Sequence, residues 1–327
     1  MRQRRIKVAP EEERAVYHCM SRTVNGERLF DDVAREVLRK QFWQVAEYCG
    51  LQIITHAILS NHFHVLVRVP LKVTPSDSEL LRRYRTLYPT PTAHQNARLE
   101  VISQQLATNG PEAVLWRRQQ LALMGDVSPF MKLVKQRFSI WFNRSRQRYG
   151  TLWSERFKSV LVEPDGRALR TIAAYIDLNG VRAGLVHDPK DDRFCGYAAA
   201  LAGHLRAQAG LCSIHDNLPW AEVQAGYRQV LFGTGSGTRQ QGGIIAPEKF
   251  QQVLRSEGTL PLASVLRCRL RFFTDGAILG SRVFVALQLA AHRRRTGRQG
   301  MPPAPPLPLA HWGDLTVLRK PRRHAVG

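Results

Sequence analysis

The chain has 327 residues, of which 48 are Lys or Arg and 26 are Asp or Glu, so its formal net charge is +22. A hydrophobic content of 44% predicts a folded core, with room for one main domain and an accessory region. Such an excess of positive charge favours a polyanionic partner, and a nucleic acid, the ribosome and a membrane surface all meet that description. The placement of the charge must decide between them.

The sequence also argues against a zinc-binding, disulfide-linked, secreted or membrane-spanning protein. The five cysteines form no CxxC pair, which disfavours a zinc site and a disulfide framework. The charged N-terminus lacks the apolar run of a secretory signal, and no stretch approaches 18 apolar residues. We therefore expect a soluble, cytoplasmic protein that does not enter a membrane.

The N-terminal part of the chain alternates between strand and helix patterns. Residues 15–21 predict a strand, and Asp32 is a candidate N-cap of a helix that Gly50 ends. The apolar runs 51–59 and 62–69 are separated only by Ser-Asn, which predicts a hairpin.

A polar segment, residues 72–126, contains helical patches and predicts a helical insertion. After it, Ser128 is a candidate N-cap of a helix that stops near Gly150, and residues 156–163 predict a strand. The order strand, helix, strand, strand, helix, strand predicts an α+β fold, a ferredoxin-like split βαβ antiparallel sheet backed by helices.

A further helix should begin after Asp165 and end at Gly180, which is placed to act as a left-handed terminator. We assign residues 1–205 to the main domain and 206–290 to an accessory helical region. Residues 291–327 form a basic, Pro-rich tail that we expect to be disordered.

Two histidines fall on one face of the predicted strand HFHVLVRV. Alternation places His62, His64, Leu66 and Arg68 on that face, where two imidazoles suit two ligands of a divalent ion. The plainer alternative is a pair of polar residues on a solvated sheet face. Leu66 stands where a histidine-triad nucleotide hydrolase has its third histidine, so that family is disfavoured.

Tyr175 and Asn179 are spaced i, i+4 on the predicted helix, so both side chains lie on one face. The plainer alternative is a packed tyrosine with a satisfied hydroxyl. A phenol is a weak nucleophile at neutral pH, and an adjacent metal that polarises a phosphate would offset that weakness.

Residues 131–158 are rich in Lys and Arg with interleaved aromatic residues. Some of the rings must belong to the core, but cationic groups with a few exposed rings suit a single strand of nucleic acid, because charges contact phosphates and rings stack on bases. The candidate nucleic-acid-binding residues of the whole chain are Arg22, Arg137, Arg144, Arg156, Lys158 and Arg182.

Four blocks together resemble the HUH-superfamily single-tyrosine transposases, especially the REP-associated tyrosine transposases of bacteria. In that family the two histidines of the HUH motif bind Mg or Mn, which implies His62 and His64. The tyrosine of the YIxLN block is the nucleophile, which implies Tyr175, and the polar residue one turn later, here Asn179, completes the metal site. The blocks are YHCMSR (17–22), SNHFHVLV (60–67), FMKLVKQRFSIWFNRSRQRYGTLWSERFKSVLVE (130–163) and YIDLNGVRAGLV (175–186).

The resemblance implies a DNA transposase that nicks and rejoins single-stranded DNA through a 5′-phosphotyrosine intermediate. It also implies a divalent metal, no small-molecule cofactor, a single-stranded or hairpin DNA partner and a homodimer. The sequence departs from the family at Gly180, where the family usually has proline. Two rivals stay open: a domesticated protein that binds structured single strands without cutting them, and an RNA-binding protein on the same scaffold, which Tyr175 disfavours.

Overall fold

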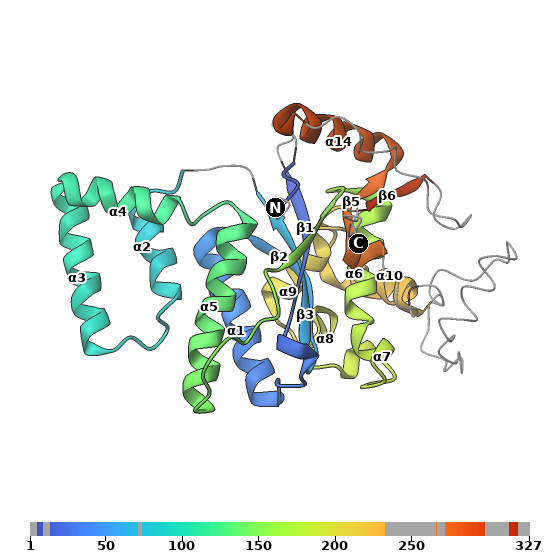
Figure 1. The fold of residues 1–327 in the computed structure, drawn as a ribbon, viewed down its shortest axis with the longest axis horizontal. Coiled ribbons are helices and arrows are strands. Elements are labelled where there is room, and N and C mark those ends of the chain that lie inside the picture. The colour runs from blue at the N-terminus through green and yellow to red at the C-terminus, as the bar shows by residue number, and fades with distance from the viewer. Residues whose placement is uncertain are drawn as a thin grey trace, which may run out of the picture.

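The computed structural model describes residues 5–8, 14–70, 74–232, 266, 272–297 and 314–319. A single six-stranded sheet with the order β2-β3-β1-β4-β5-β6 forms the centre of this part of the chain (Figure 1). The strands are β1 (Ala15–Arg22), β2 (Gln52–Ile58), β3 (His62–Val69), β4 (Lys158–Val162), β5 (Gly276–Ser281) and β6 (Leu315–Arg319).

Helices surround this sheet and form a separate group at one end of the molecule. The longer ones are α1 (Asp32–Cys49), α2 (Asp77–Thr86), α3 (Ala93–Thr108), α4 (Pro111–Leu121), α5 (Val127–Ser145), α6 (Gly166–Asp177), α9 (Leu205–Cys212), α10 (Trp220–Phe232) and α14 (Arg282–Thr296). The shorter ones are α7 (Asn179–Arg182), α8 (Gly196–Leu201), α13 (Phe272–Asp275) and the 3-10 turns Val24–Gly26 and Pro189–Asp191.

The first four strands confirm the predicted ferredoxin-like arrangement. Strand β1 pairs antiparallel with β3 on one side and with β4 on the other, and β2 pairs antiparallel with β3. Helix α1 connects β1 to β2, and α5 precedes β4, as the split βαβ pattern requires. The hairpin between β2 and β3 turns at Ser60 and Asn61, where Leu59 N–H donates to the His62 carbonyl over 2.8 Å.

Helices cover both faces of the sheet. On one face, the ring of Phe63 packs edge-on against Phe42 of α1 and against Trp153, with centroids 5.0 and 5.6 Å apart. On the other, Thr55 of β2 donates to Asp177 of α6 over 2.6 Å. Figure 1 shows α1 and α5 on one side of the sheet and α6 on the other. Helix α6 therefore packs on the histidine face of β3, where His64 is buried and His62 is half-buried.

Two helix starts lie one or two residues before their predicted positions. Asp31, not Asp32, caps α1, because its carboxylate accepts from Ala34 N–H over 2.8 Å. Asp126, not Ser128, caps α5, and its carboxylate accepts from Ser128 N–H over 2.6 Å. In both cases the carboxylate of the residue directly before the helix accepts from an unpaired amide of the first turn. Gly50 ends α1 with φ 66°, as predicted.

Gly180 does not end a helix in the left-handed conformation, which corrects the prediction. It lies inside the short helix α7, and the positive φ of 67° occurs at Gly184. Close packing explains the glycine, because a Cβ atom at position 180 would lie 2.3 Å from a carboxylate oxygen of Asp192. The residue serves close approach rather than chain reversal.

The insertion predicted at residues 72–126 is helical and consists of α2, α3 and α4. In Figure 1 this group projects from the side of the molecule that carries α1 and α5. It is tied to the core by a 2.7 Å hydrogen bond from the Tyr48 hydroxyl of α1 to the Gln120 amide oxygen of α4.

The C-terminal region adds two strands to the sheet, which the sequence did not predict. Strand β5 lies parallel to β4, with Leu161 opposite Ile278, and β6 pairs antiparallel with β5. The region 206–290 therefore contains strand β5 as well as helices, and the predicted tail contains the end of α14 and strand β6. The Gly-rich stretch 233–243 and the Pro-rich stretch lie outside the described residues. The domain boundary at residue 205 stays a prediction.

No helix in the described ranges has the length and apolar character needed to cross a membrane.

Candidate active site

The strand register gathers polar residues on one face of the sheet. Residues directly opposite each other in an antiparallel pair share a face. His62 lies opposite Arg22, His64 lies opposite Met20, and Met20 lies opposite Lys158. Three strands that are far apart in sequence thus place two imidazoles and two cationic side chains next to one another.

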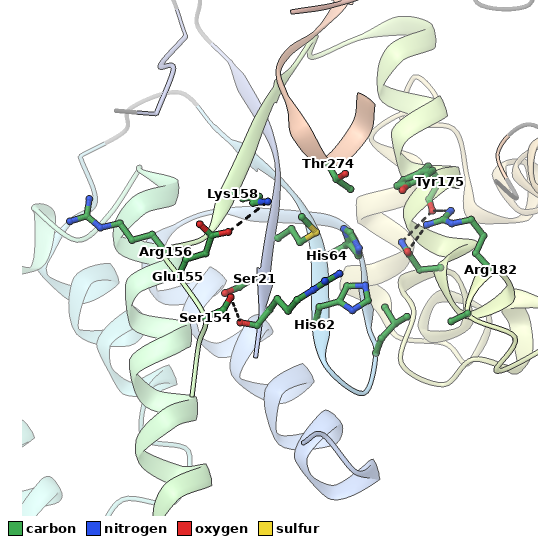
Figure 2. A pocket seen from close by; sticks show the side chains of 15 residues that line it. Ser21, His62, His64, Ser154, Glu155, Arg156, Lys158, Tyr175, Arg182 and Thr274 are labelled. Atoms are coloured by element: carbon green, nitrogen blue, oxygen red, sulfur yellow. Dashed lines mark hydrogen bonds and ion pairs between the residues drawn. The ribbon is translucent and has the colours of Figure 1, made fainter. Parts of the chain in front are cut away.

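A pocket of about 500 Å³ opens at this place. In Figure 2 the imidazoles of His62 and His64 lie between Lys158 on one side and Tyr175 with Arg182 on the other. The pocket contains every residue predicted for catalysis or metal binding. It is lined by Met20, Ser21, Arg22, Leu59, His62, His64, Ser154, Glu155, Arg156, Lys158, Tyr175, Asn179, Arg182, Ala183 and Thr274.

His64 is buried and hydrogen-bonded to a third histidine. Its Nδ1 lies 2.9 Å from Nε2 of His18, and the two rings stack with centroids 5.1 Å apart. Nδ1 of His18 lies 2.8 Å from the carbonyl oxygen of Phe273. Burial lowers the pKa of His18 to about 4 and that of His64 well below its usual value, so both rings are neutral at pH 7.

His62 lies at the more open end of the pocket. Its Nδ1 is 2.6 Å from the amide oxygen of Asn61, whose amide nitrogen donates to the Gly26 carbonyl over 2.9 Å. The rings of His62 and His64 are 5.2 Å apart and nearly perpendicular. The alternation predicted from the sequence therefore holds.

Tyr175 is fixed in place from three sides. Helix α6 supplies it, and its side chain is only 1% exposed. The ring of Phe273 meets it edge-on with centroids 4.7 Å apart. The guanidinium carbon of Arg182 lies 3.7 Å from its ring centroid, which is a cation–π contact. These contacts fix the orientation of the Tyr175 ring.

Asn179 lines the same pocket, but its amide is engaged by the protein. Its nitrogen donates to the carbonyl oxygens of Ile176 and Tyr175 over 3.0 and 3.3 Å. Its oxygen accepts from Arg182. To serve as a metal ligand, this oxygen would exchange the guanidinium for the cation. The ligand role of Asn179 stays a prediction.

The structure separates the six predicted nucleic-acid-binding residues into two groups. Arg22, Arg156, Lys158 and Arg182 line the pocket. Arg137 and Arg144 do not. Arg137 donates to the carbonyl of Leu87, which lies in the insertion, and Arg144 is exposed on α5.

The stretch around Arg144 is also less basic than its sequence indicates. Arg146 pairs with Asp31, and Arg148 lies 4.0 Å from Glu27, so residues from another part of the chain offset two of its cations. Nearby, Tyr149 is 95% exposed and is the most open of the interleaved aromatic residues. Phe138 and Phe142 belong to the core, as we expected for some of these rings.

The donor atoms of the pocket suit a divalent cation bound by two protein nitrogens. Among the residues that the structure describes, no three His, Cys, Asp or Glu side chains form a group that could hold a metal. An ion at His62 and His64 would therefore take its remaining ligands from an amide, from water or from phosphate oxygens. Imidazole and oxygen donors together fit Mn well and Mg less well.

Sequence reasoning missed two contributors to the site, His18 and Phe273. A histidine among the apolar residues of the strand AVYHCMSR is a signal, because most buried side-chain polar groups have a hydrogen-bond partner. Phe273 gave no signal, since it lies 255 residues from His18 and joins the site only through the C-terminal part of the sheet.

The fold and pocket define a class: an α+β protein whose ferredoxin-like sheet carries paired imidazoles beside a helix-borne tyrosine in a basic pocket. Residues 12–84 match the family model described as "Transposase IS200 like". This match agrees with the resemblance drawn from the sequence blocks. The matched range contains His18, His62 and His64 and ends before Tyr175.

No curated protein sequence matches the chain. Among solved structures, one of a REP-associated tyrosine transposase bound to a REP hairpin is similar at 14% identity, covering 63% of this chain and 87% of that one, with a TM-score of 0.35.

Proposed function

We propose that this protein is a metal-dependent DNA transposase that nicks and rejoins single-stranded DNA, with Tyr175 as nucleophile. One observation carries the proposal: the pocket joins Tyr175 to His62 and His64, although these residues come from a helix and a strand more than 100 positions apart. Four cationic side chains line the same pocket, where they would neutralise a DNA backbone.

In the proposed reaction, the Tyr175 hydroxyl oxygen attacks a DNA phosphorus as the hydroxyl loses its proton. The bond from phosphorus to the 3′ oxygen breaks, and that oxygen takes up a proton to become a free 3′-OH. The product is a 5′-phosphotyrosine. A 3′-OH from a second strand reverses the step, which rejoins DNA without ATP because the phosphodiester energy is conserved.

The protein residues have distinct parts in this scheme. His62 and His64 would hold Mg or Mn, which supplies charge withdrawal from the phosphate oxygens. Arg182 orients the Tyr175 ring, and Arg22, Arg156 and Lys158 bind phosphates on the open side of the pocket. A homodimer and a hairpin as the recognised DNA form are further parts of this proposal, which rest on the resemblance.

A second candidate function is binding of structured single-stranded DNA without cleavage. The burial of Tyr175 and the engagement of the Asn179 oxygen by Arg182 favour it, since both groups must become accessible for chemistry. The intact set of His62, His64 and Tyr175 favours the enzyme.

The deciding experiment incubates hairpin-bearing single-stranded DNA with the protein and Mg or Mn and seeks a protease-sensitive adduct on a denaturing gel. We expect an adduct from the wild type and none from Tyr175→Phe, which keeps the ring and its packing. His64→Ala should also form none while still binding DNA. Adduct from Tyr175→Phe would move the nucleophile role elsewhere, with Tyr149 and Tyr17 the next candidates. Binding without any wild-type adduct would support the second function.

A further inference from the structure

A chain of hydrogen bonds fixes which ring nitrogen of His64 carries its proton. The Phe273 carbonyl can only accept, so the nitrogen of His18 that faces it, Nδ1, must donate. A neutral imidazole has one N–H, and Nε2 of His18 is therefore an acceptor. It lies 2.9 Å from Nδ1 of His64, so Nδ1 of His64 is the donor in that bond. The lone pair of His64 is then on Nε2.

His62 is fixed by a second, independent chain. The Asn61 amide nitrogen donates to the Gly26 carbonyl, which decides the orientation of the amide. Its oxygen then faces Nδ1 of His62 over 2.6 Å and can only accept. Nδ1 of His62 therefore carries the proton, and the lone pair of this ring is also on Nε2.

We propose that His18 and Asn61 are positioning residues, which hold His64 and His62 in the same tautomer so that both present Nε2 to one divalent cation. The inference rests on the proposed metal site and names the residues that prepare it. Histidine ligands of metals in proteins are commonly oriented through their second ring nitrogen, and removal of such a partner typically weakens metal binding about 10- to 100-fold.

The hydrogen bonds that run through His18 also connect the C-terminal region to the site. Its terminal acceptor is the backbone carbonyl of Phe273, in α13, directly before β5. The side chain of the same residue packs on Tyr175. One residue thus supports both the cation-binding and the nucleophilic half of the pocket.

The first test reads the tautomers in the wild-type protein, and variants serve only to assign its signals. Long-range ¹H–¹⁵N correlation of histidine-labelled protein at pH 7 reports the tautomer of each ring, with His62→Ala, His64→Ala and His18→Gln used for assignment among the 11 histidines. We expect the Nδ1–H form for His18, His62 and His64. An Nε2–H form of His64 overturns the inference.

The second test measures Mn²⁺ binding by electron paramagnetic resonance and calorimetry. His18→Leu removes the acceptor and should weaken binding about 10- to 100-fold, whereas His18→Gln places an amide oxygen near the position of Nε2 and should retain most of the affinity. His56→Leu is the matched control, because His56 is also fully buried on a neighbouring strand but its ring nitrogens have no hydrogen-bond partner among the described residues. It should bind Mn²⁺ as the wild type does.

His64→Ala distinguishes failure of the proposed metal site from failure of the positioning role of His18. If it binds Mn²⁺ as tightly as the wild type, the proposed metal site is wrong. If it loses binding while folded His18→Leu, checked by circular dichroism, binds as the wild type does, the metal site stands and the positioning role of His18 is refuted.

Discussion

The guanidinium of Arg182 lies over the ring of Tyr175, with 3.7 Å between its central carbon and the ring centroid. The same guanidinium donates to the Tyr175 carbonyl over 2.7 Å, to the Leu266 carbonyl over 3.2 Å and to the amide oxygen of Asn179. One side chain therefore connects the proposed nucleophile, the proposed third ligand and the C-terminal region.

Arg182→Ala should remove one donor from the Tyr175 and Leu266 carbonyls and should end the cation–π contact with the Tyr175 ring. We expect the free energy of unfolding to fall by about 1–3 kcal/mol and adduct formation to fall at least tenfold. Chemical denaturation and the gel assay measure the two effects. The control is Arg193→Ala, whose guanidinium also lies near an aromatic ring, Phe194, but is exposed. Normal adduct formation by Arg182→Ala would show that Arg182 is not needed to orient Tyr175.

Arg156 and Arg144 should differ in their effect on DNA binding, although the sequence places both in one basic stretch. Arg156 lines the pocket and Arg144 does not. Charge reversal at Arg156 should lower the affinity for single-stranded DNA and reduce the slope of log affinity against log salt by about 0.7 for each phosphate that the variant no longer neutralises. The same change at Arg144 should have the smaller effect. Titrations at several salt concentrations measure the affinity and the slope for each variant. Equal slopes for the two variants would contradict the proposal that the DNA binds at the pocket.

Asn179→Ala should reduce adduct formation without abolishing it. Water can replace a neutral amide ligand, so activity should recover partly at high Mn²⁺ concentration. The rate of adduct formation against Mn²⁺ concentration is the measurement. A variant whose rate and Mn²⁺ dependence match the wild type would restrict Asn179 to its observed contacts with α6 carbonyls and Arg182.

Asp177 should make stability depend on pH between about 4 and 7. It is fully buried, and burial raises its pKa to about 7, although hydrogen bonds from Thr55, Tyr227 and Tyr197 N–H oppose the shift. The folded state thus binds this proton more tightly than the unfolded state. Its contribution to stability is complete below about pH 4 and is lost as the pH rises through 7.

The test compares denaturation of the wild type with Asp177→Asn across this range. The wild type should lose stability relative to the variant with rising pH, by up to about 1.4 kcal/mol per pH unit. The side chain joins α6 to β2 and α10, so both proteins must be shown to fold. A difference that stays constant from pH 4 to 8 would show that Asp177 is ionised throughout.

The sequence by itself determined the local features of this protein. The two-residue period of HFHVLVRV placed His62 and His64 on one face, and the order of strand and helix patterns gave the ferredoxin-like sheet, because both depend on periodicity within a few residues. The spacing of Tyr175 and Asn179 placed them near each other for the same reason.

Only the tertiary structure decided which distant groups meet. The partner of His64 is His18 and the support of His18 is Phe273, and both follow from strand register and from a C-terminal strand that pairs with the free edge of β4. The sequence context of Gly180 predicts a helix terminator, but the structure shows that a Cβ atom there would clash with Asp192. Such relationships depend on non-local pairing and close packing, which the local pattern of side chains does not determine.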